Sequence, residues 1–219
     1  MSAATESPAA VGRRIVDGGL ELLRARLLRE PPMLPLAPTR GDYDLNPQNR
    51  PSAPPNLTQA AVLVPLIYRD EPRVLLTQRT DTLSSHAGQV SFPGGRADPK
   101  DISLVETALR ETQEETGIEP AFVTVAGFLD AYETGTGYAI LPVVGILSEG
   151  FALSPHEGEV AEIFEVPLAF LLDPANRQRD TREFRGVTRS FYAFRYDGHY
   201  IWGATAAMLV DFGDRIAAP

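Results

Sequence analysis

The feature that most constrains the fold is one strongly patterned helix near the middle of the chain. Ser103 followed by Glu106 matches a capping box that starts a helix, with Asp101 as a competing cap. Gly117 is a helix stop signal. The face expected to be buried follows the i, i+3, i+4, i+7 spacing and consists of Val105, Ala108, Leu109 and Thr112. Such a helix needs an apolar surface to pack against.

The last turn of this helix carries three carboxylates, Glu111, Glu114 and Glu115, that project from one edge of the buried face. Like charges at i, i+4 cost a few tenths of a kcal/mol, and acids near a helix C-terminus oppose the macrodipole by ~0.3–1 kcal/mol each. A solvated acidic face is the ordinary interpretation of such a pattern. Three glutamates at the unfavourable end of a well-patterned helix instead favour a site for a hard cation, Mg²⁺ or Mn²⁺. We expect Arg110 to orient these carboxylates.

The remainder of the chain contains mostly short apolar runs that are typical of strands. Few of them are separated by a helix long enough for regular βαβ winding, so we expect an α+β fold with a mixed sheet and helices on its faces. Strands are expected at residues 60–68, 72–79, 122–133, 138–148 and 191–203, and helices at residues 166–173 and 204–216.

The first quarter of the chain has a different composition. Residues 12–30 carry a loosely helical apolar stripe, which predicts an amphipathic helix that packs on the main body or on a partner. Residues 30–38 and 49–56 are rich in proline and predict extended chain. We therefore divide the sequence into an arm, residues 1–56, and a domain, residues 57–219. The sequence leaves open whether the first helix mediates a homodimer.

Composition excludes several classes of function. The formal net charge of −9 argues against binding to nucleic acid or to an anionic membrane surface, because both require a basic footprint. The sequence has 0 cysteines, which excludes disulfides, a thiolate metal site and a cysteine nucleophile. No apolar run approaches the length of a membrane span. A reducing cytosol fits these features, and we expect a cytoplasmic protein.

The helix and the loop before it resemble the Nudix box. The residues that match its second half are Arg110, Glu111, Glu114, Glu115, Gly117 and Ile118. The first half has one residue too many between Gly95 and Arg110, and Asp101 stands for its helix-opening acid. This resemblance implies a Nudix-type α/β/α sandwich and hydrolysis of a pyrophosphate with divalent ions. It also implies that Glu111, Glu114, Glu115 and the Gly95 carbonyl hold those ions.

The preceding segment LLTQRTDTLSSHAGQVSFPGG, residues 75–95, resembles the coenzyme A pyrophosphatase branch of the Nudix family. Thr80 stands where Ser or Ala is usual, and Ser84 stands where the branch has an arginine. The resemblance extends over roughly residues 57–212. It implies cleavage of coenzyme A, or a derivative, to adenosine 3′,5′-bisphosphate and 4′-phosphopantetheine.

Substrate contacts are expected from Arg79, His86, Arg96 and Tyr138. Tyr138 belongs to the turn that leads into the strand predicted at residues 138–148. A hydrogen bond that structures its loop is an equal alternative for His86.

The general base is expected among Glu111, Glu159 and Glu157. Outside the box, Glu159 is the preferred choice of base. An ordinary solvated acidic stretch is an equally weighted interpretation of the glutamates that follow the box. With Arg110 as the orienting residue, these side chains complete the predicted catalytic set.

Two other functions stay open. One is a Nudix hydrolase for another nucleoside diphosphate derivative, such as NADH or ADP-ribose. The other is a Nudix domain that binds or regulates without catalysis, against which the intact set of glutamates argues. In each case the expected partner is a small nucleotide.

Overall fold

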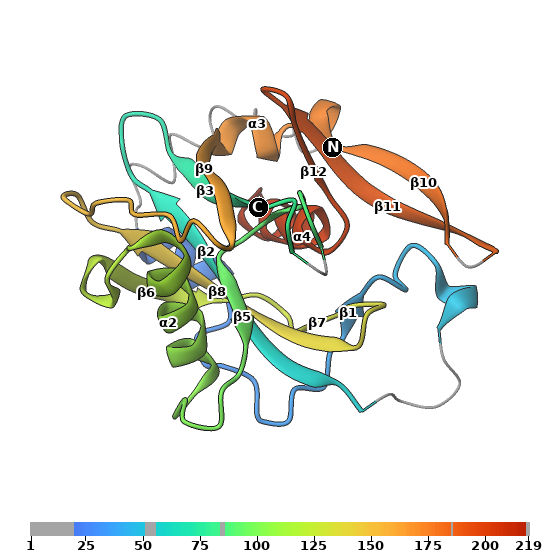
Figure 1. Cartoon of the computed structure of the whole chain (residues 1–219), viewed down its shortest axis with the longest axis horizontal. Coiled ribbons are helices and arrows are strands. Elements are labelled where there is room, and N and C mark those ends of the chain that lie inside the picture. Colours follow the sequence, from blue (N-terminus) through green and yellow to red (C-terminus); the bar gives the residue numbers. More distant parts are fainter. Residues whose placement is uncertain (1–19, 51–55, 84–85, 185, 218–219) are drawn as a thin grey trace, which may run out of the picture.

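A nine-stranded mixed sheet with helices on both faces forms the centre of the molecule (Figure 1). The computed structural model describes residues 20–50, 56–83, 86–184 and 186–217. The strands of this sheet are β1 (Arg40–Gly41), β2 (Thr58–Ile67), β3 (Arg73–Arg79), β4 (Val90–Ser91), β5 (Gly94–Arg96), β6 (Val123–Phe128), β7 (Tyr132–Glu133), β8 (Tyr138–Leu147) and β9 (Val160–Pro167). The expected α+β fold with a mixed sheet is confirmed.

The strand order explains why the sequence lacks regular βαβ units. The main path runs β1-β7-β8-β2-β3-β4, while β5 pairs with β2, β6 with β8 and β9 with β3. The pairs β2–β8 and β1–β7 are parallel, and β2–β3 is an antiparallel hairpin as expected. Residues 60–67 of β2 are all buried, because helices cover both faces of this central strand.

The helices lie on opposite faces of the sheet (Figure 1). Their bounds are α2 (Leu104–Thr116), α3 (Leu168–Leu172) and α4 (Ala204–Ala217), with single 3₁₀ turns η1 (Pro47–Asn49), η2 (Pro120–Phe122) and η3 (Pro174–Asn176). On one face Leu104 and Ala108 of α2 pack with Leu63 of β2. On the other face Met208 of α4 packs in a core with Val64.

A second, three-stranded antiparallel sheet consists of β10 (Gln178–Phe184), β11 (Val187–Tyr196) and β12 (His199–Trp202). Its inner face supplies Phe194 and Ile201 to the same core as α4. The sequence predicted β11 and β12 as a single run. It did not predict β10, whose alternating charges reflect a strand with exposed side chains, nor the short strands β1, β4 and β5.

Helix α2 begins and ends where the sequence indicates. The Ser103 side chain accepts a hydrogen bond from the Glu106 N–H, and Gly117 ends the helix at φ 79°. The buried face matches the predicted one in part, because Ala108 and Thr112 are buried as expected while Val105 and Leu109 are only half-buried. Thr116 is fully buried like Thr112. Each threonine hydroxyl donates to the backbone carbonyl four residues earlier, which makes its burial inexpensive. The buried face is therefore rotated toward Glu115.

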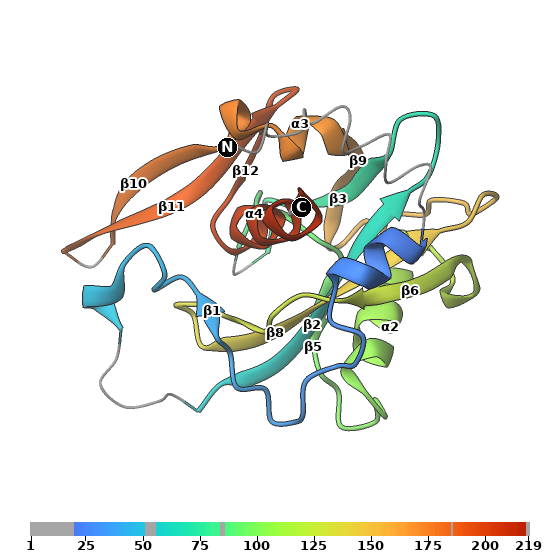
Figure 2. The same ribbon diagram turned by 180° about the vertical axis from the view of Figure 1, so that it is seen from behind.

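The described part of the N-terminal arm packs against the main body (Figure 2). Residues 20–26 are helical, Leu23 is fully buried, and Leu28 forms a bridge with Phe128. The proline-rich region that follows contributes β1 to the sheet. Residues 12–19 of the predicted helix lie outside the described residues. Within the described part of the chain, none of the helices has the length and hydrophobicity required to cross a bilayer.

We expect Gly117→Ala to destabilise the protein more than Gly198→Ala. Both glycines have left-handed φ angles, 79° and 81°, so each alanine carries a conformational cost of roughly 1–2 kcal/mol. A Cβ at position 117 also lies 2.8 Å from Ser154 Cβ, whereas nothing lies within 4 Å of one at position 198. Urea unfolding of both variants measures the difference. Equal losses would show that crowding at Ser154 is relieved without cost.

Candidate active site

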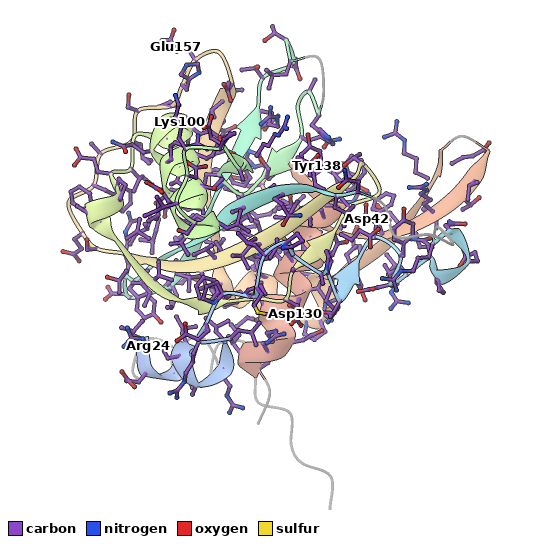
Figure 3. The ribbon with its side chains drawn as sticks, turned by 90° about the horizontal axis from the view of Figure 1, so that it is seen from below. Arg24, Asp42, Lys100, Asp130, Tyr138 and Glu157 are labelled. Atoms are coloured by element: carbon purple, nitrogen blue, oxygen red, sulfur yellow. The ribbon has the colours of Figure 1, made fainter. Side chains whose placement is uncertain are left out.

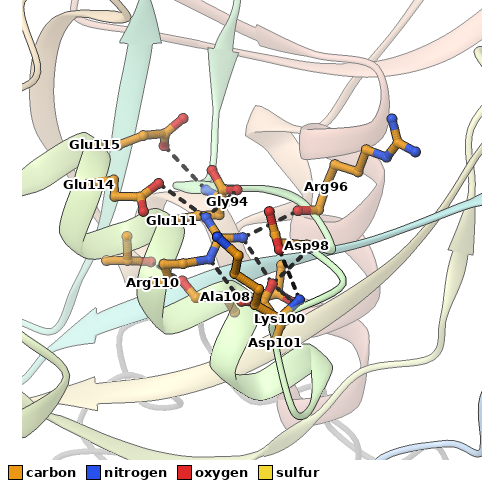
Figure 4. Close-up of polar contacts among 12 residues, drawn as sticks. Gly94, Arg96, Asp98, Lys100, Asp101, Ala108, Arg110, Glu111, Glu114 and Glu115 are labelled. Carbon is orange, nitrogen blue, oxygen red and sulfur yellow. Dashed lines mark hydrogen bonds and ion pairs between the residues drawn. The ribbon is translucent and has the colours of Figure 1, made fainter.

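Two glycines in β5 let the acidic end of α2 approach the sheet. Gly94 and Gly95 pair with Val62 and Ala61 of β2. A Cβ at Gly94 would lie 2.4 Å from the Ala61 carbonyl oxygen, and one at Gly95 would lie 2.5 Å from the Glu111 carboxylate. Neither position therefore accommodates a side chain unless its neighbours move. The carboxylates of α2 and this glycine strand consequently form one compact site (Figure 4).

Glu115 is the most buried carboxylate of the site, with 4% of the residue exposed. Its Oε2 accepts a hydrogen bond from the Gly94 N–H at 3.2 Å, and its Oε1 lies 3.7 Å from Arg79 Nη1. The pKa of Glu115 is raised to about 7, mainly by burial and also by the charges of Glu111 and Glu159, while the Gly94 hydrogen bond and the charge of Arg79 oppose the shift. The site thus concentrates negative charge where water is scarce.

Arg110 connects the loop before α2 to two of the glutamates. It donates from Nε and Nη2 to the two oxygens of Asp101, both at 2.9 Å. From Nη1 it donates to Glu111 at 2.9 Å and to Glu114 at 3.1 Å. Arg110 therefore lies where we expected it, against the carboxylates. Asp101 does not cap the helix; it holds Arg110 instead.

Asp101 is itself tightly held. Its side chain is 5% exposed, and its Oδ2 also accepts from Thr107 Oγ1 at 2.8 Å and from the Asp98 N–H at 2.9 Å. The Arg110 guanidinium, assisted by these donors, keeps the pKa of Asp101 well below its usual range. This carboxylate stays ionised at neutral pH.

The donor chemistry of the site fits a hard divalent cation, since it consists of carboxylate oxygens beside the half-buried backbone of Gly94 and Gly95. Glu111 is partly buried, and burial raises its pKa although Arg110 opposes the shift. Glu114 is 60% exposed at its side chain. Among the described residues, no three His, Cys, Asp or Glu side chains stand in an arrangement that could hold a metal ion. Glu111 and Glu114 are both turned toward Arg110 in this structure.

The two later glutamates that we considered as general base differ in position. Glu159 lies close enough for its charge to raise the pKa of both Glu111 and Glu115. Its backbone carbonyl accepts from the Thr80 N–H at 3.0 Å, which fixes the loop beside β3. Glu157 lies at the outer end of the same loop (Figure 3). The structure thus brings Glu159, and not Glu157, to the carboxylates.

The two arginines that were predicted to bind substrate differ from each other in their surroundings. Arg79 lies against Glu115, and its buried Nε has no hydrogen-bond partner among the described residues. Arg96 is exposed, and its guanidinium points away from the carboxylates (Figure 4). The Arg96 backbone carbonyl instead accepts from Arg110 at 3.4 Å.

The other two predicted substrate contacts are not at the carboxylates. His86 has a left-handed φ of 56°, and its Nδ1 lies 2.8 Å from Gln89 Oε1, as expected for a hydrogen bond that structures the loop. Tyr138 begins β8, where its N–H donates to Thr134 Oγ1 at 3.0 Å. Ser84 lies outside the described residues.

A cavity of about 660 Å³ lies on the other side of the loop that contains His86. Its walls come from five segments that are far apart in the sequence, which is why sequence reasoning missed it. The residues that line it include Asp42, Asn46, Gln89, Tyr132, Gly135, Arg182, Arg189, Phe191, Trp202, Met208 and Asp211. The aromatic residues in 191–202 were the available signal, but their pattern alone predicts only a strand.

Comparison with known proteins gives consistent matches. The NUDIX domain model matches residues 57–189. The Uncharacterized Nudix hydrolase NudL of Photorhabdus laumondii is 44% identical over 161 residues, which cover 74% of this chain and 86% of that protein. Its counterpart in Yersinia enterocolitica is 43% identical over 70% of this chain and 79% of that protein. Among solved structures, the MutT protein from Methanosarcina mazei is similar at 25% identity, with a TM-score of 0.44 over 55% of this chain and 84% of that one.

We expect Gly95→Ala to weaken Mn²⁺ binding without a large loss of stability. The new methyl group occupies the space 2.5 Å from the Glu111 carboxylate, so the side chain must move, while the backbone at residue 95 is not in the left-handed region. Electron paramagnetic resonance of free Mn²⁺ measures the affinity, and urea unfolding supplies the control. An unchanged Mn²⁺ affinity would contradict a cation site formed by Glu111 beside this glycine.

We expect Asp101→Asn to lower the free energy of unfolding at pH 7 by about 1–3 kcal/mol, because it leaves Arg110 without its bidentate partner. The pKa of Asp101 is depressed in the folded state, so its contribution is present above the unfolded pKa, near 3.8, and is lost as the pH falls through the lower folded pKa. The difference between wild type and variant should therefore shrink below about pH 4. Urea unfolding at several pH values measures this, and a difference that grows with acidity would rule it out.

Proposed function

Because the chain belongs to the Nudix family and is a pyrophosphohydrolase, we propose that it cleaves coenzyme A, or a derivative, to adenosine 3′,5′-bisphosphate and 4′-phosphopantetheine. The observation that best supports this choice is the position of Arg79. It belongs to the segment 75–95 that resembles the coenzyme A branch, and it lies beside Glu115 with a buried Nε that has no hydrogen-bond partner in the described part of the chain. We place this activity in the cytoplasm, on the strength of the cysteine-free sequence.

Glu111, Glu114, Glu115 and the Gly95 carbonyl would hold Mg²⁺ or Mn²⁺. Such an ion supplies charge stabilisation at the pyrophosphate when it is bound. Arg110 serves the same site from the protein side, because it keeps Glu111 and Glu114 close together against their mutual repulsion. With a cation bound, the carboxylates would share it in place of this arginine.

Arg79 and Glu159 have the remaining roles in this proposal. The Arg79 side chain is 24% exposed, and its guanidinium would donate to a phosphate oxygen of the substrate. Glu159 is exposed at the edge of the carboxylate group and would accept the proton of the attacking water. Glu111 is the alternative base within the helix.

We expect Glu111→Gln to lower coenzyme A hydrolysis by about 10²–10³-fold, because it removes one charged ligand next to the reacting phosphates. Glu106→Gln is the matched control, since it changes the same residue type in the first turn of α2, where the side chain only accepts a backbone hydrogen bond. Chromatography of the two products measures turnover. Undiminished metal-dependent hydrolysis by Glu111→Gln would disprove the site.

The substrate itself is tested by a panel of coenzyme A, acetyl-coenzyme A, NADH and ADP-ribose with the wild-type protein. A preference for coenzyme A or its thioester is the expected result. Faster cleavage of NADH or ADP-ribose would replace this substrate with the alternative one. Absence of cleavage of all four, with Mg²⁺ and with Mn²⁺, would favour a binding role.

A further inference from the structure

The cavity of about 660 Å³ adjoins the carboxylate site, and its volume falls in the range of ~300–1,000 Å³ typical of small-molecule sites. Arg79 and Gln89 lie between the two. The Arg79 N–H donates to the Gln89 carbonyl at 2.9 Å; Arg79 faces Glu115, and Gln89 lines the cavity. One backbone hydrogen bond therefore links the cavity wall to the residue that lies beside Glu115.

One wall of the cavity is held in place by a buried asparagine from the N-terminal arm. Asn46 is 4% exposed; it donates from Nδ2 to the Ser190 carbonyl at 2.8 Å and accepts from the Ser190 N–H at 2.8 Å. Asn46 thereby binds both the backbone N–H and the backbone carbonyl of Ser190. This residue of β11 lies before Ala193, where the pairing with β12 begins. The arm and the β10–β11 hairpin consequently form a continuous wall.

Two aromatic side chains line the cavity from one face of the small sheet. The rings of Phe191 and Trp202 are 5.2 Å apart between centroids, and both residues are only partly buried. Partly exposed aromatic rings of this kind stack on planar bases.

The same face carries two arginines directly opposite each other. Arg182 of β10 pairs in register with Arg189 of β11, and both line the cavity. Like charges at opposed strand positions destabilise a sheet, and an anion between them removes the repulsion. The Arg182 side chain makes no hydrogen bond or ion pair with any residue that the structure describes. The hairpin wall therefore offers positive charge to a ligand.

The acidic residues that line the cavity have hydrogen-bond or ion-pair partners of their own. Four aspartates line it: Asp42, Asp44, Asp130 and Asp211. Arg40 pairs with Asp44 and Asp211, each at 2.9 Å, and Arg215 pairs with Asp130 and Asp211. Asp42 accepts from Tyr132 Oη at 2.8 Å and from the Gly135 N–H at 2.7 Å. The two arginines offset two of the four negative charges, and the donors to Asp42 are neutral, so the positive charge is local to the wall that carries Arg182 and Arg189.

We propose that this cavity binds the nucleoside end of the substrate, with the base against Phe191 and Trp202 and a phosphate on the ribose at Arg182 and Arg189. The assignment rests on the proposed function, because it identifies which end of coenzyme A enters the cavity. The pantetheine arm has neither a planar ring nor a phosphate at its far end, so it would use neither the aromatic nor the cationic wall.

The single tryptophan of the sequence, Trp202, reports directly on the cavity. The test is a titration of the full chain with adenosine 3′,5′-bisphosphate in EDTA, followed by tryptophan fluorescence and by calorimetry. Saturable quenching is expected, with affinity about five- to tenfold weaker for adenosine 5′-monophosphate, which lacks the phosphate at Arg182. No quenching is expected with 4′-phosphopantetheine.

Arg182→Gln should abolish the preference for the bisphosphate and leave adenosine 5′-monophosphate binding unchanged. Arg195→Gln is the matched control, because Arg195 lies on the same hairpin, pairs with Asp180 and does not line the cavity. It should retain the preference.

Coenzyme A hydrolysis with no binding of the bisphosphate would overturn the cavity assignment and leave the proposed function intact. Quenching by 4′-phosphopantetheine, or an unchanged preference in Arg182→Gln, would overturn it as well. Selective bisphosphate binding by a protein that does not cleave coenzyme A would refute the proposed function and support the cavity as a nucleotide site.

Discussion

The bidentate ion pair between Arg110 and Asp101 is the interaction on which the acidic site depends. Glu111 and Glu114 lie on the same side of one helix end, where they repel each other and oppose the helix dipole. Arg110 bonds to both, and Asp101 fixes Arg110 from the preceding loop. Because the side chain of Asp101 is only 5% exposed, water screens this clamp only in part, and the clamp keeps the loop, the helix and the carboxylates in one arrangement.

The glycines of β5 complete this arrangement from the sheet side. Their missing side chains allow Glu111 and Glu115 to lie against the backbone, and the Gly94 N–H stabilises Glu115 in part. The pKa of Glu115 is nevertheless about 7, because the effect of burial outweighs the hydrogen bond from Gly94 and the charge of Arg79. A site built in this way is locally costly, and a bound cation is the physical means of removing that cost.

The sequence predicted the parts of this arrangement that are local. The bounds of α2, its cap at Ser103 and the grouping of its glutamates follow from spacing along one helix. The role of Asp101 could not be predicted, because one additional residue before Arg110 disturbs the pattern, and only the fold shows that both side chains still meet. The buried face of α2 was predicted only in part: Ala108 and Thr112 are buried as expected, but Thr116 is polar by type and was missed, although its hydroxyl donates within the helix. The cavity was invisible for another reason: its walls are brought together by tertiary contacts such as Asn46 with Ser190.

The family match covers the whole carboxylate site but only part of the cavity, because Arg182 and Arg189 lie inside it. The carboxylates, the β5 glycines and Arg79 all lie within residues 57–189, which match the NUDIX domain model. Asn46, Phe191 and Trp202 lie outside that segment, in the arm and in the strands that follow it. Chemistry at the pyrophosphate would thus depend on the shared segment. Selection among nucleotides would depend both on Arg182 and Arg189 of that segment and on the flanking elements that carry Asn46, Phe191 and Trp202. A change in the arm that loosens Asn46 would then alter substrate choice without any contact with the carboxylates.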